Sequence, residues 1–176
     1  FSVWGSEYNG TDRAMLPAMF ACLAKLRAGD QFNILVETDK VIPFASSCIQ
    51  ATPGNISIAM EFLVTVWAGG RWTTIRNLSF RQALSQLPLD RFKNELIYCS
   101  TVSSTVTPPD SLHLMLEELT AVNCTVSALT TNRLHESYID SLVQWTGGVK
   151  LYINKDNSIL NAELLMDERV HAAMEQ

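Results

Sequence analysis

The chain has 176 residues, of which 47% are hydrophobic and 18% are charged, and its net charge is −5 at neutral pH. This length suits one α/β domain, whose hydrophobic content supplies a core that folds without disulfide bonds or a structural metal. The acidic balance and the absence of a lysine and arginine cluster exclude a general nucleic-acid-binding surface. No apolar run reaches the length of about 20 residues that a membrane-spanning helix needs.

The first elements are a strand and a helix. Residues 1–4 have strand character, and apolar residues at helical spacing then predict a helix over residues 14–26. Thr11 or Asp12 is a suitable cap for that helix, and Pro17 is expected in its first turn.

A hairpin is predicted next. The apolar run 31–36 predicts one continuous strand, and residues 41–44 predict a second strand after a short polar turn. Pro43 cannot donate a ladder hydrogen bond, so the second strand is expected at an edge of the sheet.

Helices and strands alternate through the rest of the chain. This order predicts an α/β fold of the doubly wound class, with a mostly parallel sheet, one antiparallel edge strand and helices on both faces. Ligands of such folds bind beyond the carboxyl ends of the strands, so the functional residues are expected there. The predicted helices cover residues 56–67, 77–87, 108–122, 136–145 and 158–174, and the predicted strands cover residues 95–99, 124–129 and 149–153.

Several segments together carry a family resemblance. Residues 25–34, 51–70, 97–110 and 126–148 follow one another as in a von Willebrand factor type A domain, which the chain resembles to about residue 153. The likeness is to the inter-alpha-trypsin-inhibitor heavy-chain type and to intracellular, cilium-associated proteins that carry this domain. It implies a Rossmann-like domain over residues 1–154, followed by a C-terminal helix over residues 155–176 that packs on the domain or links it to a following unit.

The resemblance also implies a place for a divalent cation. The family holds Mg²⁺ with an Asp-x-Ser-x-Ser loop, a threonine and a second aspartate, because this ion prefers hard oxygen ligands. Here the loop positions fall on Trp4, Ser6 and Tyr8, and the second aspartate falls on Val102. Both carboxylates are missing, so we expect a degenerate site with no metal and no cofactor, in which Trp4 and Val102 fill the vacated space.

The same face binds partners in the family. Its threonine falls on Arg71, or on Thr73 or Thr74 if this loop carries an insertion. An exposed Arg71-Trp72 pair is typical of an interface anchor, although Trp72 folded back onto the sheet is an equal alternative. The predicted partner-binding residues are Ser6, Glu7, Tyr8, Arg71, Trp72, Thr73, Ser103 and Ser104.

These features favour a metal-independent protein-interaction or scaffold module within a larger protein or assembly. An enzyme is not expected, and neither is binding to nucleic acid; the protein partners are not identified. One alternative is a metal-dependent adhesion domain with a site rebuilt from Glu7, Ser6 and Thr73 or Thr74, and another is an enzyme with an unrecognised site. The Asn-x-Ser/Thr triplet at Asn123 directly precedes a predicted core strand, a poor place for a glycan, so we expect an intracellular location. The resemblance implies a ciliary one, and an extracellular location is the alternative.

For the remaining chemically distinctive residues, the sequence predicts structural roles. The cysteines lack metal-finger spacing and are expected as buried free thiols. Trp67 and Trp145 lie on apolar helix faces and are expected in the core. His113, His135 and His171 lie on separate helices or their caps and are expected at the surface.

Overall fold

The computed structural model describes residues 2–4, 12–37, 40–69, 78–87, 93–100, 109–131 and 137–174. The strands are β1 (Ser2–Trp4), β2 (Gln31–Phe32), β3 (Leu35–Glu37), β4 (Val41–Pro43), β5 (Ile49–Gln50), β6 (Asn94–Ser100), β7 (Cys124–Thr130) and β8 (Lys150–Tyr152). The helices are α1 (Asp12–Ala24), α2 (Pro53–Gly69), α3 (Leu78–Gln86), α4 (Pro109–Ala121), α5 (Ser137–Thr146) and α6 (Ser158–Met174).

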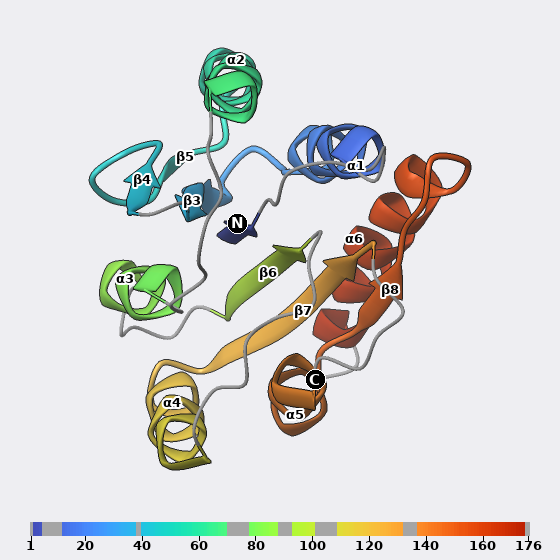
Figure 1. The fold of residues 1–176 in the computed structure, drawn as a ribbon. Coiled ribbons are helices and arrows are strands. Elements are labelled where there is room, and N and C mark those ends of the chain that lie inside the picture. The colour runs from blue at the N-terminus through green and yellow to red at the C-terminus, as the bar shows by residue number, and fades with distance from the viewer. Residues whose placement is uncertain are drawn as a thin grey trace.

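A six-stranded sheet with the order β4-β3-β1-β6-β7-β8 forms the centre of the described part of the chain. Its paired strands run parallel, except that β4 is antiparallel to β3. Figure 1 shows α1 and α2 on one side of the sheet and α3, α4 and α5 on the other. The predicted α/β fold and the antiparallel edge strand that contains Pro43 are confirmed.

Alternating side chains of β6 divide the hydrophobic core in two. Ile97 and Cys99 are buried together with residues of α1, α2 and α6. Leu96 and Tyr98 are buried on the opposite face, with residues of α3, α4 and α5. Successive side chains of a strand point to opposite faces, so the consecutive apolar residues 96–99 of β6 need a helical layer on each side.

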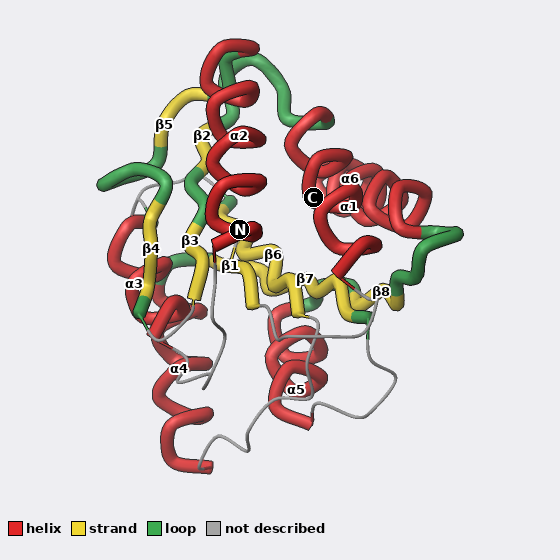
Figure 2. Tube along the Cα trace, turned by 45° about the horizontal axis from the view of Figure 1, so that its top comes forward, coloured by secondary structure: helices red, strands yellow, loops and turns green. Residues whose placement is uncertain are grey.

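The C-terminal helix α6 packs beside α1, as Figure 2 shows. Ala162 and Leu165 of α6 are fully buried in the cluster that contains the α1 residues. The Cys22 thiol of α1 lies 3.9 Å from the Ala162 carbonyl oxygen, and Lys25 Nζ lies 3.5 Å from Asp167 Oδ1. One face of α6 therefore belongs to the same core as α1 and the sheet.

The prediction of one strand over residues 31–36 is wrong, because Asn33 interrupts it. Asn33 is 7% exposed, and its Oδ1 accepts the backbone N–H groups of Ile34 at 2.8 Å and Ala45 at 3.0 Å. Its Nδ2 donates to the Ala45 carbonyl at 2.8 Å and to Gln86 Oε1 at 2.7 Å. The Asn33 side chain thus takes the hydrogen-bonding place of a neighbouring strand. Strand β2 pairs with β5, a strand that the sequence pattern did not reveal.

Two helices begin earlier than the apolar pattern indicates. Helix α1 begins at Asp12, which moves Pro17 out of the expected first turn and into the helix interior, where it cannot donate a backbone hydrogen bond. Helix α2 begins at Pro53, and Thr52 caps it because its Oγ1 accepts the Asn55 N–H at 3.2 Å. Proline in the first position is compatible with a helix start, since that N–H has no helical partner.

The prediction that Trp145 lies in the core is also wrong, since its side chain is 69% exposed. The inward position in the last turn of α5 belongs to Thr146, whose Oγ1 accepts the Val126 N–H at 2.9 Å and donates to the Leu142 carbonyl at 2.7 Å. Trp145 is therefore turned outward, toward solvent. The side chain of Trp67 lies outside the described residues.

A tight turn joins α5 to β8. Gly147 has φ 71°, a left-handed conformation that glycine adopts without strain, and the Gly148 N–H donates to the Val143 carbonyl at 2.9 Å. A Cβ added at Gly148 would lie 1.9 Å from the Val126 carbonyl oxygen. The backbone of β7 therefore leaves no room for any side chain at this position.

Gly148→Ala should lower the free energy of unfolding by about 3 kcal/mol, because the new methyl group meets backbone that cannot move aside without distorting β7. Urea denaturation followed by circular dichroism measures the difference. Gly54→Ala is the matched control: a Cβ there meets open space in α2, and the substitution should stabilise by about 0.5 kcal/mol. Equal stability of the Gly148→Ala and wild-type proteins would contradict the geometry of this turn.

Candidate functional site

The carboxyl ends of the central strands coincide at one edge of the sheet. In the register of the parallel pairs, Trp4 of β1 lies opposite Ser100 of β6, and Ser100 lies opposite Thr130 of β7. Trp4 also lies opposite Glu37 of β3, and Thr130 lies opposite Tyr152 of β8. The segments that leave these strands therefore start side by side from a single row of residues.

The neighbouring strands β1 and β6 lead to helices that lie on opposite faces of the sheet. Strand β1 leads to α1, which packs in one core, while β6 leads to α4, which packs in the core of the opposite face. Adjacent segments that depart to opposite faces define a topological switch point, where α/β sheets bind their ligands. The candidate site is thus the edge from which segments 5–11 and 101–108 leave.

The predicted site residues belong to the segments beyond this edge. Trp4 is the last residue of β1, and its side chain lies outside the described residues. The other predicted residues lie outside the described residues, so their contacts stay predictions. These are Ser6, Glu7 and Tyr8 in segment 5–11, Arg71, Trp72 and Thr73 in segment 70–77, and Val102, Ser103 and Ser104 in segment 101–108.

Two threonines at the end of β7 add buried hydroxyl groups that sequence reasoning missed. Thr130 is 2% exposed and Thr131 is 5% exposed, and the Thr130 carbonyl accepts the Ile153 N–H at 2.8 Å. Thr131 Oγ1 is buried and has no hydrogen-bond partner within the described structure. Buried polar side-chain atoms without a hydrogen bond are rare in folded proteins. The signal in the sequence was a Thr-Thr pair directly after an apolar strand.

Metal-ligating side chains do not gather in the described regions, where no group of three or more His, Cys, Asp or Glu residues is arranged to hold an ion. His113 lies on the exposed side of α4, where its Nε2 is 3.2 Å from Glu117 Oε1. Its predicted surface position is confirmed. His135 and the side chain of His171 lie outside the described residues.

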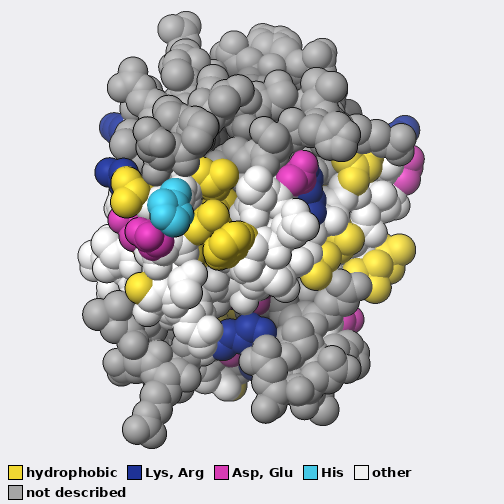
Figure 3. All heavy atoms as spheres, turned by 90° about the horizontal axis from the view of Figure 1, so that it is seen from below, with side chains coloured by type: hydrophobic (Ala, Val, Ile, Leu, Met, Phe, Trp, Pro, Cys, Tyr) yellow, Lys and Arg dark blue, Asp and Glu magenta, His cyan; other side chains and the backbone are white. Residues whose placement is uncertain are grey.

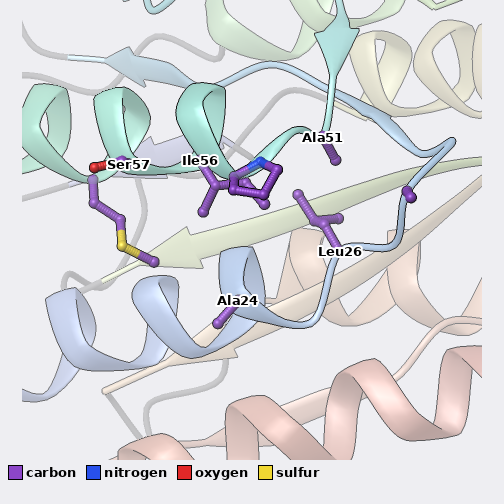
Figure 4. Close-up of a pocket in the computed structure, with 8 residues that line it drawn as sticks. Ala24, Leu26, Ala51, Ile56 and Ser57 are labelled. Carbon is purple, nitrogen blue, oxygen red and sulfur yellow. The ribbon is translucent and has the colours of Figure 1, made fainter.

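A shallow groove of about 510 Å³ lies between the end of α1 and the start of α2, away from the strand ends. Figure 4 shows side chains from these two helices and their flanking segments facing one another across it. The Ser57 hydroxyl is the one polar side-chain group among the residues that line it. Without an acid, a base or a nucleophile with a partner, the groove does not form a catalytic site. Its lining residues are Ala24, Leu26, Ala28, Ala51, Pro53, Ile56, Ser57 and Met60.

The cysteines are free thiols, and their surroundings suppress nucleophilic chemistry. Burial raises the pKa of Cys99 to about 12. Burial, and then the nearby Glu95 carboxylate, raise the pKa of Cys124 to about 12 as well. Cys48 is half-buried rather than buried as expected, and burial raises its pKa too. Because the thiolate is the reactive form, neither Cys99 nor Cys124 is suited to act as a nucleophile at neutral pH.

Alkylation should distinguish the thiols of the native protein. Iodoacetamide at pH 8 is expected to modify Cys48 at least tenfold faster than Cys99 or Cys124, since these two are buried and their pKa values of about 12 keep them protonated. Peptide mass spectrometry over time measures each rate, and the same reaction in denaturant should modify all cysteines at similar rates. Rapid native labelling of Cys99 would show that this part of the core opens.

The fold has solved counterparts, although the sequence matches no protein-family model and no curated protein. A structure described as von Willebrand factor type A from Catenulispora acidiphila is similar with a TM-score of 0.67 and 12% identity. The match covers 88% of this chain and 37% of that chain. An aerotolerance-related membrane protein from Bacteroides fragilis is similar with a TM-score of 0.66 and 10% identity, over 89% of this chain and 88% of that one.

These likenesses show that the chain has a von Willebrand A-like α/β fold. The chain spans little more than a third of the length of the Catenulispora structure. In the described regions, no helix combines the length and the apolar character that crossing a membrane requires.

Proposed function

We propose that this domain is a protein-interaction module that docks a partner at the carboxyl edge of its sheet. The observation that carries the proposal is the switch between β1 and β6, which starts segments 5–11 and 101–108 side by side at one edge. Binding surfaces of α/β folds are built from such segments. The von Willebrand A-like fold agrees with an interaction or adhesion role.

Binding at this edge is proposed to be independent of a divalent cation. The residues at the family's metal positions are Trp4, Ser6, Tyr8 and Val102, a set without a carboxylate. Mg²⁺ is bound in proteins through carboxylates and other hard oxygens that offset its charge, so this set does not fit the ion. Trp4 and Val102 instead supply apolar bulk that closes the position.

The partner is proposed to contact segments 5–11, 70–77 and 101–108. Tyr8, Arg71 and Trp72 are the proposed anchors, since aromatic residues and arginine dominate the binding energy of protein interfaces. Hydrogen bonds to the partner come from Ser6, Glu7, Thr73, Ser103 and Ser104.

The module is proposed to act as a non-enzymatic scaffold within a larger protein or assembly. The support for a non-enzymatic role is the von Willebrand A-like fold. The family resemblance favours an intracellular assembly, with the cilium as one compartment.

Affinity capture tests the proposed docking edge. The purified chain serves as bait in an extract of cells that produce it, and quantitative mass spectrometry compares wild type with Trp72→Ala, each with Mg²⁺ and with EDTA. Trp72→Ala should reduce capture of the partner about tenfold or more, as loss of an interface anchor does. Chelation should leave capture unchanged.

The matched control for this experiment is Ile58→Ala, which removes a side chain of α2 that is 56% exposed and lies away from the strand ends. It should capture the same proteins as wild type. Capture that EDTA abolishes, or that Trp72→Ala leaves unchanged for every enriched protein, would contradict the proposed function.

A further inference from the structure

The outer face of α4 and α5 exposes hydrophobic side chains that the core does not use. Trp145 of α5 is 69% exposed and Leu114 of α4 is 52% exposed. Leu112 and Leu116 of α4 are partly buried, at the margin of the core cluster beneath. Figure 3 shows hydrophobic side chains gathered on this face. Exposed tryptophan and leucine side chains are typical of a binding surface, because exposed apolar groups gain most when a partner covers them.

The two helices that carry these side chains are neighbours in the structure. Helices α4 and α5 pack side by side in one layer, as seen in Figure 1. Leu112 and Leu116 are one turn apart and therefore lie on one flank of α4. Helices pack by setting the ridges of one into the grooves of another, and an amphipathic helix laid between two others is a common mode of recognition.

The charges of this face define the partner further. Helices α4 and α5 carry four acidic residues and no lysine or arginine. Glu118 is exposed, and Glu117 is also exposed beside His113. Asp140 Oδ1 accepts Lys150 Nζ of β8 at 2.6 Å, so this acid already has its cation. Of the described carboxylates, Glu118 is thus without an ion pair, and Glu117 pairs only with the imidazole of His113.

The neighbouring helix does not cancel this charge. Helix α3, in the same layer, contributes a single basic residue, Arg81, and no acidic one. The three helices together remain net negative. A cationic partner is therefore complementary to this face, whereas an anionic partner is repelled by it.

We propose that the α4–α5 face binds a cationic amphipathic helix of a partner protein. The aliphatic side chains of that helix are buried against Leu116 and Trp145, and its lysine or arginine side chains pair with Glu117 and Glu118. A cation that stacks on the Trp145 indole adds a cation–π contribution. This surface is separate from the strand ends, so the inference does not rest on the proposed docking edge.

A synthetic helix tests the proposal directly. The probe is a fluorescein-labelled peptide of about 14 residues, which matches the length of α4, with leucine on one face and lysine on the other. Fluorescence anisotropy measures its affinity for the whole chain. A peptide with glutamate in place of lysine and a scrambled lysine-leucine peptide are the controls, and both should bind at least tenfold more weakly.

Variants of the protein locate the binding. Trp145→Ala should weaken binding of the lysine-leucine peptide about tenfold or more, while its melting temperature stays unchanged because the side chain is exposed. The double variant Glu117→Gln, Glu118→Gln should weaken binding about threefold and reduce its dependence on salt. Ile58→Ala, an exposed apolar residue on α2, and Trp72→Ala should bind the peptide as wild type does.

Any of four results would overturn the proposal: no measurable binding of the lysine-leucine peptide, equal binding of the glutamate peptide, unchanged binding by Trp145→Ala, or self-association that Trp145→Ala abolishes. The last result, from sedimentation velocity, would assign the face to a second copy of this chain. Trp72→Ala tests the docking edge, and Trp145→Ala tests the α4–α5 face. Failure of either proposal therefore leaves the other unaffected.

Discussion

Strands β6 and β7 are buried on both faces, and the rest of the structure depends on this burial. They pair in parallel along their full length, from Asn94 opposite Cys124 to Ser100 opposite Thr130. Parallel strands cannot be joined by tight turns, so each connection must cross the sheet as a helix. Since both faces of β6 are apolar, those helices must form two layers. The two hydrophobic clusters, one with α1, α2 and α6 and the other with α3, α4 and α5, are the result.

This constraint also produces the two surfaces to which we assign binding. Full pairing aligns the strand ends in one row, and helices on opposite faces of the sheet separate the segments that follow β1 and β6. The second surface arises because α4 and α5 turn one face to the core and leave the other in water. One surface is made of connecting segments and the other of helix faces, so each can bind its own partner.

The alternation of apolar segments was sufficient to predict the α/β class and most elements, because each element buries one stripe or face. The predictions that failed concern residues whose positions depend on contacts with residues distant in sequence. Asn33 has the neighbours of a strand residue, and its bonds to Ala45 and Gln86 appear only after folding. Trp145 follows Leu142 at helical spacing, yet the bond of Thr146 to Val126 sets which residue faces inward. For the site, strand order alone predicts the carboxyl edge of the sheet, whereas the contacts of its loop residues depend on how those segments fold.

The central claim is that the carboxyl edge functions without a divalent cation, and thermal unfolding during titration with Mg²⁺ or Mn²⁺ tests it most directly. An ion that binds the folded state alone stabilises it by about 2.7 kcal/mol at a hundred times its dissociation constant. For a domain of this size, that corresponds to a rise in Tm of about 5 °C or more. The proposed apolar closure by Trp4 and Val102 predicts a change of less than about 1 °C. A saturable rise of about 5 °C that Glu7→Ala removes would contradict the account and show a rebuilt metal site.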